Sequence, residues 1–303
     1  MNNSVLAVDL GGTNIRLAAV SAAGKLLYTV KRPTKTAAEP AALVSALAEM
    51  AAPCMSAGED APAAIGLGVP ANVTPGGRIR HLPNIPTLEN FDLGGELGKK
   101  LGIPVVLEND ATAACIGEAW LGASKGINTS ILITLGTGLG GGVIVNGRAL
   151  RGPDGGAGKI GHVCVEPDGH PCGCGSHGCI EQYASATALV RMADEAGLKV
   201  ESSHEVYEAF QKGDKKASSV FEKMGRYLGI TLGGLVNTLN PEMIVIGGGV
   251  AAGLDAFLPA LEKEMHYRAF DEPAKRARVV GSSLGDNAGL LGAARSALDS
   301  LVP

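Results

Sequence analysis

The sequence, 303 residues long, predicts an α/β protein made of two similar lobes. Short apolar strands alternate with segments of helical periodicity, a pattern typical of a sheet covered by crossover helices. In addition, the chain begins one pattern twice, a strand, a glycine-rich turn and a second strand, first at residue 5 and again at residue 130. A repeat of this kind indicates duplicated lobes with a cleft between them.

Apolar periodicity and turn residues locate the expected elements of the first half. Strands are predicted at 5–9, 15–20, 26–30, 64–69 and 105–108, and helices at 38–55 and 111–121. The first three strands form a meander, because only short turns separate them. Asn109 and Asp110 stand where they can cap the second helix.

The second half repeats the meander and then continues with longer helices. Strands are predicted at 131–135, 141–145, 243–246 and 279–280, and helices at 181–196, 217–239 and 288–301. No low-complexity linker separates the halves, so the boundary is expected near residues 121–128.

The composition excludes several classes of protein. With 46% hydrophobic and 18% charged residues, the chain is globular rather than disordered. The 26 Lys and Arg against 30 Asp and Glu give a net charge of −4, so nucleic acid is not an expected partner. Residues 127–147 carry no charge, but their many Gly and Thr make a poor membrane span, and the polar start of the chain is no secretory signal. We therefore expect a cytoplasmic protein without a membrane partner.

Two glycine-rich turns are candidates for binding phosphate. They contain Asp9, Gly11, Gly12, Thr13 and Asn14 in the first turn, and Gly136, Thr137, Gly138 and Gly140 in the second. Backbone N–H groups of such turns can cradle a polyphosphate, although a hairpin also uses glycine for positive φ angles. The carboxylate of Asp9 would repel a triphosphate unless a cation lay between them, so ATP with Mg²⁺ is expected.

Other glycine motifs are weaker or absent. Gly247, Gly248 and Gly249 follow a buried strand and fit either a surface for adenine or ribose or a plain strand-to-helix turn. Neither of the two main turns is a Walker A loop or a dinucleotide fingerprint, because a strand and not a helix follows each.

The segment Glu108, Asn109, Asp110 lies where a predicted strand meets a helix. At this edge of a parallel sheet, α/β proteins present their ligand-binding groups. If ATP binds the glycine turns, an attacking alcohol needs a carboxylate to orient it and accept its proton, and Asp110 is the candidate base. Asn109 can both donate to and accept from a sugar hydroxyl. The alternative is that these residues only cap the helix.

A cluster of cysteines and a histidine predicts a structural zinc site. The expected ligands are His162, Cys172, Cys174 and Cys179, which leave no open coordination position. A disulfide between Cys172 and Cys174 would be strained. His170 and His177 are rivals for the fourth position. The remaining cysteines, Cys54, Cys115 and Cys164, are expected to be ordinary buried residues.

Taken together, these motifs resemble the ROK family of repressors, open reading frames and kinases. The resemblance is carried by Asp9-Leu-Gly-Gly-Thr, Leu107-Glu-Asn-Asp110, Leu135-Gly-Thr-Gly-Leu-Gly-Gly-Gly, Gly161-His162, the segment 172–181 and Ile246-Gly-Gly-Gly. It covers nearly the whole chain, with the motifs in the expected order. It implies a two-lobed, actin-like and hexokinase-like ATPase fold with duplicated ribonuclease H-like lobes. The lobes would be 1–121 plus a returning helix in 286–303, and 122–285.

The same resemblance implies roles for individual residues. Asp110 would be the catalytic base, and Asn84, Asn109, His162 and Glu181 would contact the sugar. Residues 7–14 and 138–145 resemble the family's two ATP-binding segments. ROK repressors carry a DNA-binding domain before the first strand, for which a strand beginning by Val5 leaves no room. The family's usual homodimer is the expected assembly.

The sequence departs from the family pattern at two positions. Lys159 stands where the family has a sugar-binding glutamate, so that an ammonium replaces a carboxylate. It would pair with Glu181, donate to a sugar hydroxyl, lower the pKa of Asp110 or turn away into water. Ala71 replaces a usual glycine and adds a methyl group beside the sugar.

The sequence thus predicts a kinase that transfers phosphoryl from Mg-ATP to the 6-hydroxyl of a hexose, with glucose as the substrate. In-line transfer with Asp110 as base and closure of the lobes to exclude water would be its mechanism. Alternatives are an N-acetylglucosamine or N-acetylmannosamine kinase, a fructokinase, or a sugar-binding regulator that has lost turnover through Lys159.

Overall fold

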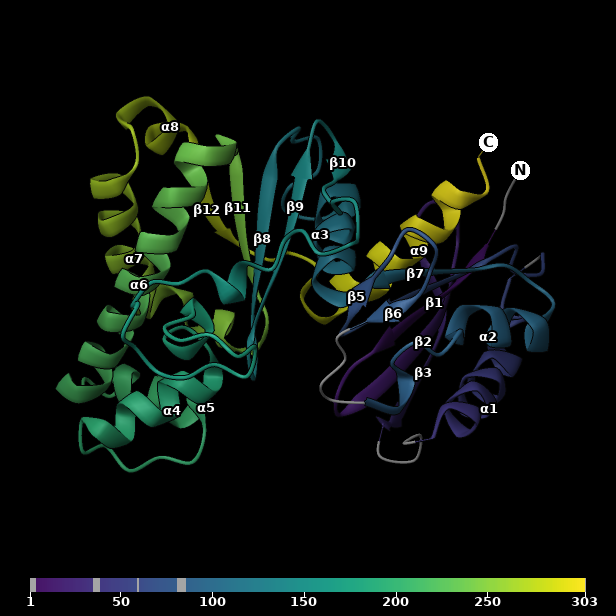
Figure 1. The fold of residues 1–303 in the computed structure, drawn as a ribbon, viewed down its shortest axis with the longest axis horizontal. Coiled ribbons are helices and arrows are strands. Elements are labelled where there is room, and N and C mark those ends of the chain that lie inside the picture. The colour runs from purple at the N-terminus through teal and green to yellow at the C-terminus, as the bar shows by residue number, and fades with distance from the viewer. Residues whose placement is uncertain (1–3, 35–38, 59, 81–85, 303) are drawn as a thin grey trace. The chain divides into compact units, whose positions relative to one another are not determined.

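The computed structural model describes residues 4–34, 39–58, 60–80 and 86–302 (Figure 1). The chain divides into two compact units. Unit 1 consists of Met1–Gly126, Ala149–Ala157 and Asp286–Pro303, and unit 2 of Ile127–Arg148 and Gly158–Gly285.

Unit 1 is built on a mixed sheet with the strand order β3-β2-β1-β4-β7. Its strands are β1 (Val5–Leu10), β2 (Asn14–Val20), β3 (Leu26–Pro33), β4 (Ile65–Val69) and β7 (Val105–Asn109). The first three are antiparallel, and β4 is parallel to both β1 and β7. Asp9 is in register with Gly68, and Gly68 with Glu108, so this register brings the ends of β1 and β7 to one edge of the sheet. A small hairpin, β5 (Asn72–Val73) and β6 (Ile79–Arg80), follows β4.

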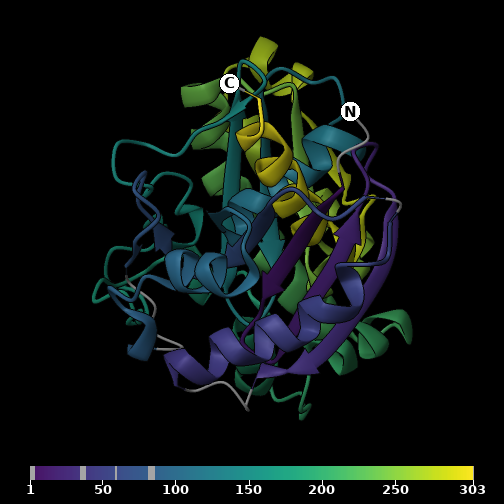
Figure 2. The ribbon, with the colours of Figure 1, turned by 90° about the vertical axis from the view of Figure 1, so that its right-hand side faces the viewer.

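The described residues of unit 1 also form the helices α1 (Pro40–Ala51), α2 (Leu93–Leu101), α3 (Asp110–Leu121) and α9 (Ala288–Ser300). Helix α1 buries Leu43, Leu47 and Met50 in a core shared with the strands, and Figure 2 shows it crossing one face of β1, β2 and β3. Apolar residues at helical spacing therefore place α1 on the sheet.

Helices α3 and α9 touch backbone to backbone. A Cβ atom at Gly292 of α9 would lie 1.6 Å from the carbonyl oxygen of Ala113, and one at Gly117 of α3 would lie 2.2 Å from that of Ala288. Only glycine fits at these two crossings, so α9 is specified by small residues as well as by its apolar face.

Unit 2 repeats the architecture with the order β10-β9-β8-β11-β12. Its strands are β8 (Ser130–Leu135), β9 (Leu139–Val145), β10 (Arg148–Ala149), β11 (Met243–Gly247) and β12 (Arg278–Gly281). Strands β8 and β9 are antiparallel, and β11 is parallel to both β8 and β12. The two sheets share one topology, which confirms the predicted repeat of the meander.

The helices of unit 2 are α4 (Ala186–Glu195), α5 (Ser203–Gln211), α6 (Lys215–Leu239), α7 (Leu254–Arg268) and α8 (Asp271–Arg276). Helices α6 and α7 run side by side (Figure 1). Phe221 of α6 and Phe257 of α7 are buried in the hydrophobic core of unit 2. Short 3₁₀ turns lie at Ala52–Cys54, Pro86–Leu88, Ile160–His162, Ile180–Gln182, Gly249–Gly253 and Gly285–Asn287.

Two expectations from the sequence differ from the structure. The helix predicted from residue 181 begins only at Ala186, because Ser185 accepts a hydrogen bond from the N–H of Ala188 and caps it there. Residues 149–157, placed by the sequence in the second lobe, belong to unit 1, where the carbonyl oxygen of Val73 would lie 1.8 Å from a Cβ at Gly155.

Some helices were not anticipated at all, among them α2 and α7. Helix α2 contains three glycines in nine residues and α7 contains Pro259, and both features weaken a helical pattern. Among the residues that the structure describes, no helix is long and apolar enough to cross a membrane.

Candidate functional site

The first glycine turn joins β1 to β2 in unit 1. It is closed by a hydrogen bond from the N–H of Gly11 to the carbonyl oxygen of Asn14 (3.0 Å). Thr34, buried at the end of β3, donates its hydroxyl to the carbonyl of Gly11 (2.7 Å) and its N–H to the carbonyl of Thr13 (2.9 Å). Two carbonyl groups of the turn are therefore held on the side of β3.

Asp9 is the last residue but one of β1, just before this turn. Burial, followed by the negative charge of Asp110, raises the pKa of Asp9 to about 6, and Asp286 adds to the rise while Arg16 opposes it. The start of α9 approaches closely here, since a Cβ at Gly289 would lie 3.5 Å from the carboxylate of Asp9. Neighbouring carboxylates in a partly buried place favour a divalent cation, which would offset their repulsion.

Asp110 follows β7 and starts α3. Its Oδ1 accepts hydrogen bonds from the N–H of Ala111 (2.8 Å) and from Nδ2 of Asn109 (2.9 Å). Both hold this carboxylate oxygen in one position. The carboxylate therefore has the fixed orientation that a general base needs.

Asn109 is the N-cap of α3 and is buried. Its Oδ1 accepts from the N–H of Thr112 (3.0 Å) and from the Thr112 hydroxyl (3.2 Å), and its Nδ2 also donates to the carbonyl of Ala71 (3.1 Å). With Asp110 counted, all donors and acceptors of the amide are occupied. The predicted cap is confirmed, and the same amide holds Asp110 and the loop at Ala71. The expected contact of Asn109 with a sugar stays a prediction.

An ion pair between Glu108 and Arg151 lies near Asp110, and it was not predicted from the sequence. Glu108 is 5% exposed, and its Oε2 accepts from Nε (2.8 Å) and Nη2 (2.6 Å) of Arg151. The pair connects the segment 149–157 to the end of strand β7, one residue before Asn109. The two residues are 43 positions apart, and only the sheet topology brings them together.

The second glycine turn joins β8 to β9 in unit 2. The N–H of Ala186 donates to the carbonyl of Gly136 (2.8 Å), and the hydroxyl of Thr187 donates to the carbonyl of Thr137 (2.9 Å). The first turn of α4 therefore holds two carbonyl groups of the turn, as β3 does in unit 1.

Glu181 approaches the same turn from the other direction. Its Oε2 accepts a hydrogen bond from the N–H of Leu139 (3.0 Å), and a Cβ at Gly138 would lie 2.3 Å from this oxygen. Gly138 is thus required for the close approach of a carboxylate. The other carboxylate oxygen of Glu181, Oε1, lies 3.9 Å from Sγ of Cys172.

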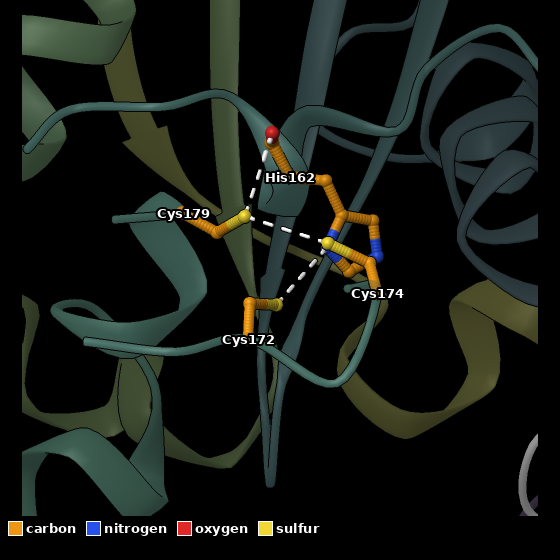
Figure 3. A group of neighbouring side chains, drawn as sticks. All are labelled: His162, Cys172, Cys174 and Cys179. Atoms are coloured by element: carbon orange, nitrogen blue, oxygen red, sulfur yellow. Dashed lines mark hydrogen bonds between the residues drawn. The ribbon is translucent and has the colours of Figure 1, made fainter. Parts of the chain in front are cut away.

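The residues predicted to bind zinc, His162, Cys172, Cys174 and Cys179, do lie together. Their ligand atoms are all within 4.8 Å of one another, and the four side chains converge in Figure 3. Sγ of Cys174 is 3.6 Å from Sγ of Cys179, and Sγ of Cys172 is 3.6 Å from Nδ1 of His162. A tetrahedral zinc with bonds of about 2.3 Å places two sulfurs about 3.8 Å apart, so the group fits Zn²⁺.

The other cysteines and histidines take other places. His170 packs against the ring of Tyr183 (5.6 Å between centroids), and neither it nor His177 joins the metal-binding group among the described residues. Cys54 and Cys115 are buried as predicted. Cys164 was predicted to be buried and is exposed, and it pairs through an isolated antiparallel bridge with Cys179.

The other predicted site residues include Lys159 and two glycines of unit 2. Lys159 is half-buried and precedes the 3₁₀ turn that contains His162. Gly247 ends β11, and Gly248 has φ +84°, with a Cβ there 2.4 Å from the carbonyl oxygen of Leu135, so this glycine is required by the turn itself. Asn84 lies outside the described residues.

Two sheets of identical topology, each with a glycine turn between its antiparallel strands, place the protein among the α/β proteins with duplicated, phosphate-cradling units. A family model described as "ROK family" matches residues 5–300. The chain belongs to the ROK family.

Individual relatives agree with this assignment. The chain is 38% identical to a glucokinase of Thermotoga maritima over 306 residues, which cover 96% of each protein. Its structure is similar to that of a ROK hexokinase from Thermus thermophilus (TM-score 0.86, 37% identity, 98% and 99% of the two chains). It is also similar to a ROK glucokinase from Streptomyces griseus in complex with glucose and AMPPNP (TM-score 0.83, 34% identity, 98% and 100% covered).

Proposed function

We propose that this protein is an ATP-dependent glucose kinase that transfers the γ-phosphoryl group of ATP to the 6-hydroxyl of glucose. The observation that carries the proposal is Asp110, a carboxylate fixed by two hydrogen bonds at the end of a parallel strand, next to a glycine turn. The nucleotide analogue and the glucose in the structure of the similar Streptomyces griseus enzyme support both substrates.

Each group then has a role in the reaction. The oxygen of the sugar 6-hydroxyl attacks the γ-phosphorus, and Asp110 accepts the proton of this hydroxyl. At the same time the bond from the γ-phosphorus to the leaving oxygen of ADP breaks. Asn109 keeps the carboxylate in position. The glycine turns offer N–H groups to the phosphates, and His162 and Glu181 are proposed sugar contacts. Lys159 is a further proposed sugar contact, and the expected role of Asn84 at the sugar stays a prediction from the sequence.

Mg²⁺ fits the chemistry of Asp9. The pKa of this carboxyl group is raised to about 6 by burial and by Asp110, and a divalent cation prefers carboxylate oxygens of this kind. When bound, the cation would neutralise charge on the phosphates. Asp9 would hold the cation, directly or through water.

Zn²⁺ fits the four side chains of His162, Cys172, Cys174 and Cys179, and we propose a structural role for it. Burial, followed by hydrogen bonding to Cys174 and Cys172, raises the pKa of Cys179 to about 12. A thiol of this kind ionises only when a cation is present. All four ligands come from the protein, so the metal fixes the loop and takes no part in the chemistry.

A second candidate substrate class follows from Lys159. Lys159 directly precedes the 3₁₀ turn that contains His162, a proposed sugar contact. An ammonium there would favour a hexose with an additional acceptor group, so an N-acetylhexosamine is the alternative substrate. We also propose the homodimer that the family resemblance implies, which light scattering during gel filtration would test.

The test is ADP release from Mg-ATP with glucose, mannose, fructose, N-acetylglucosamine, N-acetylmannosamine and allose. We expect turnover with glucose, and a loss of about 10²- to 10⁴-fold in kcat for Asp110→Asn. The amide of the variant still accepts from Asn109 through its Oδ1, so the melting temperature should stay close to that of the wild type.

Each outcome is informative. A variant with near-normal kcat would remove Asp110 from the role of base. Turnover with N-acetylmannosamine alone would replace glucose as the substrate. Folded, zinc-loaded protein without turnover on any sugar would contradict the kinase and favour a sugar-binding regulator.

A further inference from the structure

The hydrogen bonds around the second glycine turn fix the direction of its N–H groups. In a trans peptide, the carbonyl of one residue and the N–H of the next point in opposite directions. Because the Thr187 hydroxyl holds the carbonyl of Thr137, the N–H of Gly138 points away from α4. In the same way, the bond from Ala186 to the carbonyl of Gly136 turns the N–H of Thr137 away from α4. Both N–H groups are then oriented before any ligand arrives.

The third bond holds the far end of the turn. The N–H of Leu139 is taken by Glu181, and the carbonyl of Gly138 accepts from the N–H of Gly136 (3.0 Å). The peptides of residues 136–139 are therefore all oriented by hydrogen bonds. Three of these bonds come from one short segment, residues 181–187.

In unit 1, too, a threonine hydroxyl donates a hydrogen bond to a carbonyl of the glycine turn. The hydroxyl of Thr34 donates to the carbonyl of Gly11, so the N–H of Gly12 points away from β3. Thr34 comes from a strand end and Thr187 from a helix start. The same hydroxyl-to-carbonyl contact in both units indicates that orienting the turn serves a ligand and not one particular packing arrangement.

The segment 181–187 begins at the metal-binding group. Cys179 is two residues before Glu181, and its carbonyl accepts from the N–H of Gln182 (2.9 Å). Ile180 is fully buried, and its carbonyl accepts from the N–H of Ala184 (2.9 Å). Hydrogen bonds and burial thus connect Cys179 continuously to the capped start of α4, so a displacement of Cys179 would reach the glycine turn.

We propose that Thr187 is a positioning residue for the nucleotide, and that the metal bound by His162, Cys172, Cys174 and Cys179 sets the nucleotide affinity through residues 181–187. The inference rests on the proposed function, since it takes the glycine turn as a phosphate site. It adds that the metal affects ATP binding indirectly, through these residues, without contacting the phosphates itself. Thr187 orients the N–H of Gly138 and touches no substrate.

The first test removes one hydroxyl. We expect Thr187→Val to weaken Mg-ATP binding by about three- to tenfold in calorimetry, the range for one hydrogen bond. The KM for ATP should rise by the same factor, with the KM for the sugar unchanged, and Thr187→Ser should restore it. Thr187 is exposed, so the fold should tolerate valine.

Thr238→Val is the matched control. Thr238 is also exposed, also lies on a helix of unit 2, and donates its hydroxyl to the carbonyl of Gly234 (2.7 Å). We expect normal nucleotide binding in this variant. Equal losses in the two variants would overturn the inference, because the effect would then be a general one of threonine replacement.

The second test removes the metal and measures structure as well as binding. After chelation, verified by metal analysis, we expect faster hydrogen exchange at the amides of Leu139 and Ala186 and a weaker affinity for Mg-ATP. Unchanged exchange and affinity in metal-free protein would overturn the metal's part. If chelation unfolds the protein, Thr187→Val decides alone.

The two proposals fail differently. Wild-type protein that binds no Mg-ATP overturns the proposed function and this inference together. Wild-type binding with an unaltered affinity of Thr187→Val overturns this inference alone.

Discussion

At the scale of the residue, burial and neighbouring charges perturb the carboxyl group of Asp9. Its pKa is raised from 3.8 to about 6, first by burial and then by Asp110. The pKa in the folded protein exceeds that in the unfolded chain, so the folded protein keeps its proton over a wider pH range. The free energy of unfolding therefore falls as the pH rises from about 4 to about 6.

We predict that Asp9→Asn removes this pH dependence. Without Mg²⁺, the variant should be more stable than the wild type by about 1 to 3 kcal/mol at pH 7 and equal to it near pH 4. Urea unfolding at both pH values measures this. Asp60→Asn, an exposed acid of the same unit, should show no such difference. A wild type that gains stability from pH 4 to pH 7 relative to Asp9→Asn would contradict the prediction.

At the scale of the element, the contact between α3 and α9 depends on glycine. A Cβ at Gly292 would lie 1.6 Å from the carbonyl oxygen of Ala113, so one of the helices must move if this position carries any side chain. We predict that Gly292→Ala lowers the free energy of unfolding by about 3 kcal/mol, the upper part of the range for overpacking.

Gly234→Ala provides the comparison within a helix. No atom lies within 4 Å of a Cβ at Gly234 in α6, so the change should stabilise the protein by up to about 1 kcal/mol through helix propensity. Urea unfolding of both variants is the measurement. Equal stability of Gly292→Ala and the wild type would show that α3 and α9 do not pack as described.

At the scale of the whole molecule, the metal-binding group should determine thermal stability. We predict that chelation of zinc lowers the melting temperature by about 5 to 10 °C, because four ligands lose the ion that holds them together. Cys172→Ser should reproduce this loss. Cys164→Ser should retain zinc and melt like the wild type, since Cys164 is exposed and lies outside the group. An unchanged melting temperature after verified loss of zinc would refute a structural role.

Local patterns predicted much of this molecule. The meanders, the cap at Asn109 and the grouping of His162 with three cysteines depend on neighbours in the sequence or on a distinctive spacing, and the structure shows all three arrangements. Zinc binding by this group stays a prediction. The pair Arg151 and Glu108 depends on sheet topology, so no local pattern reports it. The contact of Thr187 with the glycine turn was hidden for the same reason, and because the helix was expected to begin earlier.

The position of α9 has a consequence for the order in which the chain is completed during synthesis. Helix α9 packs on β1, β4 and α3, and it leaves the ribosome after all of unit 2. Gly66 of β4 and Gly117 of α3 therefore lack their partner in α9 until residues 158–285 have been made. Unit 1 therefore completes its packing only after all of unit 2 has been made, so its apolar surface under α9 stays open to aggregation for longer during synthesis.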